Sequence, residues 1–260
     1  MLTSIRGLCA VSIAAYAAIT STTAFAQASP VASQDVDPPS ETAGPLTVSA
    51  NVTLASEYRF RGVDLSGGDF AIQGGVDAVH ESGFYVGTWA SSLDEDTVGY
   101  GSTELDIYGG WGGNLAEGLT TDVGVIAYLY PDAGPGDFDY VEFYGSLTFA
   151  IGPAEATAGV AYAPEQESLG GTGNVYVYTD VGFAIPDTPV SITGHVGYTD
   201  GFLTFTDDGD AFDWSIGAEA AIAGTPLTVG AAYVDAEGDI AQGAYDFTDE
   251  AFVFTLGANF

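Results

Sequence analysis

The residues that could do chemistry in this sequence are carboxylates and tyrosines that recur at every second position. In the segment 103–115, Glu104, Asp106 and Tyr108 alternate with Leu105 and Ile107. Alternation with period two indicates an extended strand with one polar and one apolar face. Rows of carboxylates favour cations in pores. The same pattern elsewhere predicts a path for small cations or polar solutes, lined by Asp77, Glu104, Asp106, Asp122, Glu142, Glu155, Asp180, Asp213 and Glu219.

A second cluster combines both signs of charge. Glu57, Arg59 and Arg61 occupy alternate positions near the end of a predicted first strand, 46–61, so we expect them on one face. Arginine pairs with carboxylates in a fork geometry. We expect both arginines to pair with nearby acids inside the external mouth of a pore. There they would form either a constriction with a transverse field or a structural salt bridge that braces the wall.

The remaining polar candidates give weaker signals. Aromatic tracks can stack sugar rings, but tyrosines that fill a small barrel and donate to carboxylates are the favoured interpretation. His80 lies at a predicted turn and His195 on a predicted strand, and the sequence places no catalytic partner for either. We therefore predict no catalytic residue, no metal and no cofactor, and we expect no enzyme. The tyrosines expected on the acidic side are Tyr108, Tyr128, Tyr130, Tyr144, Tyr176 and Tyr178.

These side chains require strands with two unlike faces. A charge at the lipid midplane costs about 2–4 kcal/mol for Arg or Lys and less for Asp or Glu, so the charged faces must line the interior. Short turns alternate with longer connections, which is typical of membrane barrels. The loops 199–211 and 236–250 are long enough to fold into the bore. About twelve strands are predicted, at 46–61, 69–80, 83–93, 103–115, 119–130, 138–150, 154–163, 174–185, 190–198, 212–223, 226–235 and 251–260.

The expected fold class is therefore all-β: a transmembrane antiparallel up-and-down β-barrel over residues 46–260. Both ends of the chain agree with export to a bacterial outer membrane. Residues 1–26 have a positive start, an apolar run and a small-x-small site, which predicts a signal peptide. Residues 27–45 predict a flexible periplasmic leader. The alternating segment 251–260 ends on Phe260 and resembles the closing strand that barrel-assembly machinery reads.

Charge narrows the choice of partners. The chain has 36 Asp and Glu against 3 Lys and Arg, and one of the three, Arg6, lies in the predicted signal peptide. Nucleic-acid binding is excluded because phosphate requires a basic surface. Cys9 also lies in the predicted signal peptide, so the exported protein would have no thiol. Outer-membrane lipid is the expected partner of the apolar face.

Three stretches of the sequence carry a resemblance to a known family. They are Ala55-Ser56-Glu57-Tyr58-Arg59-Phe60-Arg61-Gly62-Val63, Gln73-Gly74-Gly75 and the segment 80–91. Together they resemble the TorF family of proteobacterial outer-membrane porins. The resemblance implies an outer-membrane barrel and a pore for passive diffusion, and it brings no catalytic residue. A plugged structural or adhesive barrel, and an outer-membrane enzyme, remain as alternatives.

Overall fold

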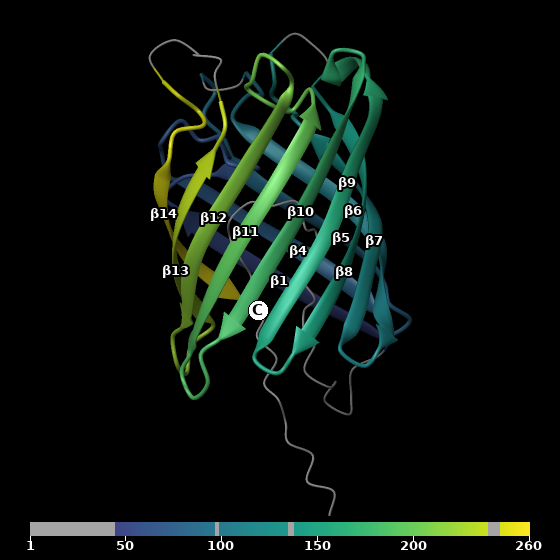
Figure 1. Ribbon diagram of the computed structural model, residues 1–260, viewed down its shortest axis with the longest axis vertical. Coiled ribbons are helices and arrows are strands. Elements are labelled where there is room, and N and C mark those ends of the chain that lie inside the picture. Colours follow the sequence, from purple (N-terminus) through teal and green to yellow (C-terminus); the bar gives the residue numbers. More distant parts are fainter. Residues whose placement is uncertain (1–44, 97–98, 135–137, 239–244) are drawn as a thin grey trace, which may run out of the picture.

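The computed structural model describes residues 45–96, 99–134, 138–238 and 245–260. Within these residues, twelve antiparallel strands close into one barrel, because β1 pairs with both β4 and β14 (Figure 1). This confirms the predicted fold class. The predicted signal peptide, 1–26, and all but the last residue of the predicted leader lie outside the described residues. The strands of the wall are β1 (Leu46–Ala55), β4 (Ala71–His80), β5 (Phe84–Ser92), β6 (Thr103–Ala116), β7 (Leu119–Leu129), β8 (Tyr140–Ile151), β9 (Ala154–Gln166), β10 (Thr172–Ala184), β11 (Val190–Gly201), β12 (Asp210–Ala221), β13 (Leu227–Ala236) and β14 (Ala251–Asn259).

The connections differ in length between the two ends of the barrel. Short turns join β4 to β5, β6 to β7, β8 to β9, β10 to β11 and β12 to β13, and the longer connections lie at the opposite end (Figure 1). β1 begins and β14 ends at the short-turn end, where the backbones of Ala50 and Phe260 exchange two hydrogen bonds of 2.9 and 3.0 Å. By the convention of outer-membrane barrels the short turns are periplasmic and the long connections extracellular.

The outer face of the wall is apolar and the inner face is polar. On β1, Val48, Val52 and Leu54 are exposed, whereas the alternate residues Ser49 and Thr53 are more covered. Large aromatic side chains lie at both ends of the outer face, as in interface girdles. None of the helices among the described residues is long and apolar enough to cross a membrane. The outward aromatics include Tyr198, Phe212, Trp214, Tyr233 and Phe252 towards the long connections and Phe84, Phe149, Phe183 and Phe260 towards the short turns.

The prediction of a first strand over 46–61 is wrong at the C-terminal end of that range. The wall strand stops at Ala55. Residues 56–70, which we call the inner hairpin, leave the wall, and most of 58–66 is buried inside the barrel, whereas 68–70 are exposed. The inner hairpin contains a small separate sheet of β2 (Arg59–Phe60) and β3 (Val63–Asp64). Glu57, Arg59 and Arg61 therefore do not line one face of a wall strand. Alternation continues past Ala55 because a hairpin inside a barrel also has two unlike faces.

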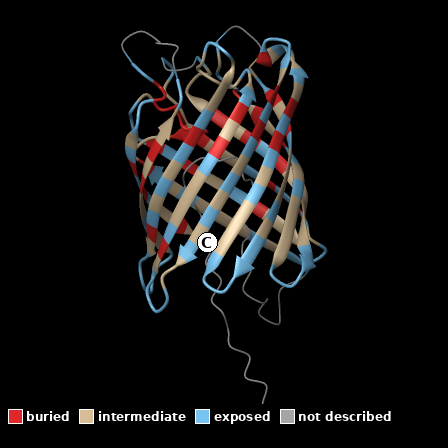
Figure 2. Ribbon diagram, viewed as in Figure 1, coloured by how far each residue is buried: buried red, intermediate tan, exposed pale blue. Residues whose placement is uncertain are grey.

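The buried residues lie mainly in the half of the barrel nearer the long connections (Figure 2). One cluster there combines Tyr58, Val63 and Leu65 of the inner hairpin with Phe247, which lies in the long connection between β13 and β14. A second cluster centres on Tyr128, Tyr130 and Tyr140 of the wall. The inner hairpin and the tyrosines of the wall thus fill this half of the bore together.

Candidate functional site: the inner hairpin in an acidic barrel

The tip of the inner hairpin is a two-residue turn. Arg61 has φ 50° and Gly62 has φ 79°, as expected of the turn type whose twist matches a tight hairpin. Positive φ is uncommon for a non-glycine residue, and this backbone conformation is kept where surrounding contacts stabilise it. A Cβ added to Gly62 would collide with Ala236 of β13 and lie 3.0 Å from the Cβ of Asp213 on β12. The tip is therefore packed tightly against the part of the wall formed by β13 and β12.

Arg61 makes the contact that crosses the bore. Its Nη2 donates to Glu142 Oε2 on β8 at 2.7 Å, and the side chains of the pair are 1% and 0% exposed. Its guanidinium also lies over the ring of Tyr176 on β10, 4.3 Å from the ring centre. In the barrel order β1 is separated from β9 by half the circumference, and β8 and β10 flank β9. A residue that follows β1 is thus anchored to almost the opposite side of the barrel.

Arg59 fixes the inner hairpin to the long connection that precedes β14. Its Nε and Nη2 donate to Glu57 Oε2 at 2.9 and 2.6 Å. Its Nη1 donates to the carbonyls of Gly62, Phe247 and Asp249 at 3.3, 3.3 and 2.9 Å. The prediction that both arginines pair with carboxylates is confirmed. However, Arg59 pairs within the inner hairpin, and only Arg61 pairs with the wall.

The base of the inner hairpin is closed by Tyr58 and Asp64. Tyr58 donates its hydroxyl to Glu104 Oε1 on β6 at 2.8 Å. Asp64 accepts from the backbone N–H groups of Ser66 and Gly68 at 2.8 and 2.6 Å, and also from the Tyr245 hydroxyl. Sequence reasoning missed Asp64. The sequence signal that could have identified it is a two-residue Arg-Gly turn at 61–62, because such a turn pairs 56–60 with 63–67 as antiparallel segments.

Residues 245–250, which directly precede β14, cover the inner hairpin. The N–H of Asp64 donates to the carbonyl of Phe247 at 2.8 Å. Thr248 donates to Asp246 Oδ1 from its backbone N–H and its hydroxyl, at 3.0 and 2.8 Å, and these hydrogen bonds lower the pKa of Asp246. Of the two loops expected to be able to fold inward, the described end of 236–250 therefore packs onto the inner hairpin, but the inner hairpin itself crosses the bore.

Towards the short-turn end, the inner face carries carboxylates held by tyrosines. Tyr108 donates to Asp77 Oδ1 at 2.6 Å, and Tyr85 donates to Asp122 Oδ1 at 2.6 Å. The hydroxyls of Tyr85 and Tyr144 lie 2.5 Å apart. These tyrosines act as hydrogen-bonded fillers of the barrel, as the favoured interpretation predicted.

Wall glycines make room for these rings. A Cβ at Gly87 would collide with the ring of Tyr108, and one at Gly124 would collide with the hydroxyl of Tyr144. Each pair consists of cross-strand neighbours, Gly87 with Tyr108 and Gly124 with Tyr144. The rings therefore lie along the wall and project less into the lumen, which leaves more of the bore free.

His195 on β11 lies between two carboxylates. Its Nδ1 is 2.6 Å from Asp180 Oδ1, and its Nε2 is 3.0 Å from Asp213 Oδ1 and 2.8 Å from the Tyr176 hydroxyl. Oxygen acceptors at both ring nitrogens suit the protonated imidazolium, which donates from both. The expectation of a hydrogen-bonded filler fits this placement. The partners were not readable from the sequence because they come from β10 and β12.

The predicted acids separate into two levels along the barrel axis. Glu104, Asp106, Glu142 and Asp213 are buried around the inner hairpin. Asp77, Asp122, Glu155 and Glu219 lie nearer the short turns, and Asp180 is 38% exposed between the two levels. The structure thus brings four of the nine together at the constriction. No group of His, Cys, Asp or Glu in the described chain has the geometry to hold a metal ion.

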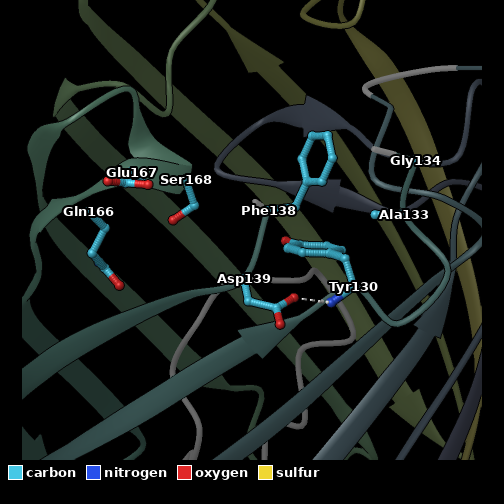
Figure 3. A pocket seen from close by; sticks show the side chains of 8 residues that line it. All are labelled: Tyr130, Ala133, Gly134, Phe138, Asp139, Gln166, Glu167 and Ser168. Atoms are coloured by element: carbon cyan, nitrogen blue, oxygen red, sulfur yellow. Dashed lines mark hydrogen bonds between the residues drawn. The ribbon is translucent and has the colours of Figure 1, made fainter. Parts of the chain in front are cut away.

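A separate hollow of about 420 Å³ lies at the rim of the long connections (Figure 3). Tyr130, Phe138 and Asp139 line one part of it, and Gln166, Glu167 and Ser168 line another. Asp139 Oδ1 accepts from the backbone N–H of Tyr130 at 2.8 Å. Behind it, Tyr100 stacks on Tyr130 with ring centres 4.4 Å apart, and burial, with Glu104 nearby, raises the pKa of Tyr100 to about 12. None of these lining residues belongs to the inner hairpin.

The closed antiparallel barrel, its apolar outer face and its polar inner face define a β-barrel of the outer-membrane channel type. The chain belongs to the family described as bacterial protein of unknown function (Gcw_chp), whose model matches residues 39–260. No curated protein sequence matches the chain. The family match does not carry the TorF name, so that resemblance stays a prediction.

Two solved structures illustrate what the chain is similar to. A structure of the KdgM porin in complex with disordered oligogalacturonate is similar with a TM-score of 0.55 and 5% identity, covering 82% of this chain and 98% of that chain. An outer membrane channel from Pseudomonas putida F1 has a TM-score of 0.48 and 12% identity, covering 86% of this chain and 99% of that chain. At such identities the likeness concerns the fold alone.

Proposed function

We propose that this protein is a porin-like channel of the bacterial outer membrane for passive diffusion of small polar solutes, with a preference for cations. The observation that carries the proposal is the sign of the charge on the inner face. Nine predicted acids belong to the wall, whereas Arg59 and Arg61 are the only arginines beyond the predicted signal peptide, and the chain contains no lysine. A bore with such an excess of carboxylates attracts cations and repels anions.

The inner hairpin is the constriction in this proposal. It crosses the bore between β6 and β12, and its contacts with the wall include a hydrogen bond, one buried ion pair and aromatic contacts with Trp89, Tyr128 and Tyr176. The carboxylates nearer the short turns, Asp77 and Asp122 among them, would line a periplasmic vestibule. The resemblance to TorF porins and the fold shared with channels support the same function. Export by a signal peptide at 1–26, a leader at 27–45 and insertion by barrel-assembly machinery complete it.

We do not propose for this chain the oligogalacturonate that is bound to the KdgM porin. Oligogalacturonate is a polyanion, and carboxylates on the inner face would repel it. Neutral or cationic solutes fit the inner face better.

A planar bilayer experiment tests the proposal. The purified barrel should give discrete current steps in potassium chloride, and in a salt gradient its reversal potential should take the sign of cation preference. A reversal potential with the sign of anion preference would overturn the assignment of the carboxylates.

A plugged structural barrel is the second candidate, and the near-complete burial of Arg61 and Glu142 favours it. In that case the purified protein should show no current steps, although it inserts and resists heat as a folded barrel. Variants that detach the inner hairpin then separate a closed channel from a permanent plug.

A further inference from the structure

The patch of wall that receives Arg61 offers more acceptors than one guanidinium uses. We call it the tip site: Glu142, Asp106, Tyr128 and Tyr176. Glu142 Oε2 accepts from Arg61, but Glu142 Oε1, Asp106 Oδ1 and the Tyr128 hydroxyl are buried without a hydrogen-bond partner in the described part of the chain. The Nε and Nη1 of Arg61 are also buried and unpartnered. The fit between the inner hairpin and the wall is therefore incomplete on both sides.

Three residues of the tip site lie on the adjacent strands β6, β7 and β8, and Tyr176 lies on β10, beyond β9. Asp106 of β6 is the cross-strand partner of Tyr128 on β7. Glu142 of β8 is the partner of Ile126, which points inward one pleat away from Tyr128. Tyr176 of β10 adds the ring face over which the guanidinium of Arg61 lies. The carboxylate of Glu142 and the ring face of Tyr176 thus converge on the buried guanidinium of Arg61, and Asp106 lies two strands away from Glu142.

Carboxylates beside an aromatic ring are the groups that bind a planar cation. A guanidinium donates two parallel hydrogen bonds to a carboxylate and stacks on an aromatic face. Buried carboxylates that lack sufficient cationic partners are unfavourable, so the tip site gains from a cation that uses more of its oxygens. Arg61 approaches from a strained hairpin turn and donates to only one carboxylate oxygen of Glu142. A free guanidinium is not tied to the turn and can donate to both oxygens.

We propose that the tip site is a recognition site for guanidinium-bearing solutes, and that Arg61 occupies it as a tethered ligand. The inference rests on the proposed function in one respect, since such a solute would arrive through the bore. A solute that replaces Arg61 releases the inner hairpin from β8 and β10. Occupancy of the tip site and the position of the constriction are then coupled.

The test uses the purified full barrel in detergent, with guanidinium chloride in the millimolar range as the probe. Arg61→Gly vacates the tip site, and glycine accepts the positive φ of the turn. Guanidinium should raise the unfolding temperature of Arg61→Gly, because a ligand that binds only the folded state stabilises it. The same concentrations should leave the wild type unchanged or lower its unfolding temperature. Equimolar potassium chloride is the matched control for ionic strength.

A double variant, Arg61→Gly with Glu142→Gln, identifies the site. The rise caused by guanidinium should disappear there, because the carboxylate that the ion would pair with is neutral. Equal rises in the single and the double variant, or no rise in Arg61→Gly, would overturn the proposal. If Arg61→Gly does not fold, Arg61→Lys serves instead. Its compact ammonium leaves the ring of Tyr176 free, and an absence of any guanidinium effect on that variant counts against the site.

Current measurements in planar bilayers distinguish a failure of the recognition site from a failure of the proposed channel function. Stabilisation by guanidinium without any current in bilayers would keep the recognition site and reject the channel. Current without such stabilisation would keep the channel and reject the site.

Discussion

Replacing Gly62 by alanine tests whether the inner hairpin is the constriction, and it does so without changing any charge. Gly62 has φ 79°, a conformation that costs an L-residue about 1–2 kcal/mol. The added methyl group would also collide with Ala236 and lie 3.0 Å from the Cβ of Asp213, and overpacking of this kind costs about 1–3 kcal/mol. The two effects together oppose docking of the tip by about 2–5 kcal/mol.

That free energy sets the size of the expected change. Each 1.36 kcal/mol is a tenfold change in an equilibrium, so even the lower bound raises the undocked population of the inner hairpin about 30-fold. Single-channel recording in a planar bilayer measures this as the fraction of time spent in a higher-conductance level. The barrel itself should stay folded, because the tip is not part of the wall, and heat-modifiable migration on a gel checks that.

Gly68→Ala is the matched control for backbone strain. Gly68 lies on the same hairpin with φ 78°, so alanine there meets the same backbone penalty. The three atoms nearest to its added Cβ all belong to Tyr245, and the closest is the hydroxyl at 3.1 Å. Gly62→Ala should therefore open the channel more than Gly68→Ala. Indistinguishable recordings from the two variants, or from Gly62→Ala and the wild type, would show that the inner hairpin does not control the bore.

Three further outcomes follow from the wall and its closing strand. Gly124→Ala should lower the free energy of unfolding in urea by about 1–3 kcal/mol, since the new methyl group collides with a tyrosine, whereas Gly182→Ala, with open space around it, should have a much smaller effect. The double variant Asp77→Asn with Asp122→Asn should move the reversal potential in a salt gradient towards zero. It should not change the fraction of time spent in the higher-conductance level, because both acids lie between the inner hairpin and the short turns. Phe260→Ala should reduce the amount of folded barrel in cells but not refolding in detergent. Its side chain is 73% exposed, and its backbone hydrogen bonds to Ala50 remain, so normal amounts in cells would reject an assembly signal.

The wall of the barrel could be predicted from the sequence because its rules are local. Every wall strand other than β1 begins and ends within three residues of the expected range. Lipid on one side and water on the other impose period two at every strand, and short turns punctuate it. Such a pattern can be read without knowing which strands meet across the bore.

The constriction could not be predicted because its determinants are not local. Alternation at Glu57, Arg59 and Arg61 is equally compatible with a wall strand and with a hairpin inside the barrel. The partners that decide between them, Glu142 and Tyr176, are far away in the sequence. The same holds for His195, whose two carboxylates belong to neighbouring strands. Sequence periodicity indicates which face a residue occupies but not which residue it meets.

The placement of the two arginines follows from the charge of the whole chain. A barrel wall with this many inward acids would repel itself at the narrowest level unless some cation were held there. Arginines fixed on a wall strand would neutralise that level permanently. Arginines on the inner hairpin neutralise it only while the hairpin is docked, because undocking withdraws Arg61 from Glu142 and leaves the acids to the solute. The contact that holds the tip of the inner hairpin against β8 therefore also masks the charge of Glu142.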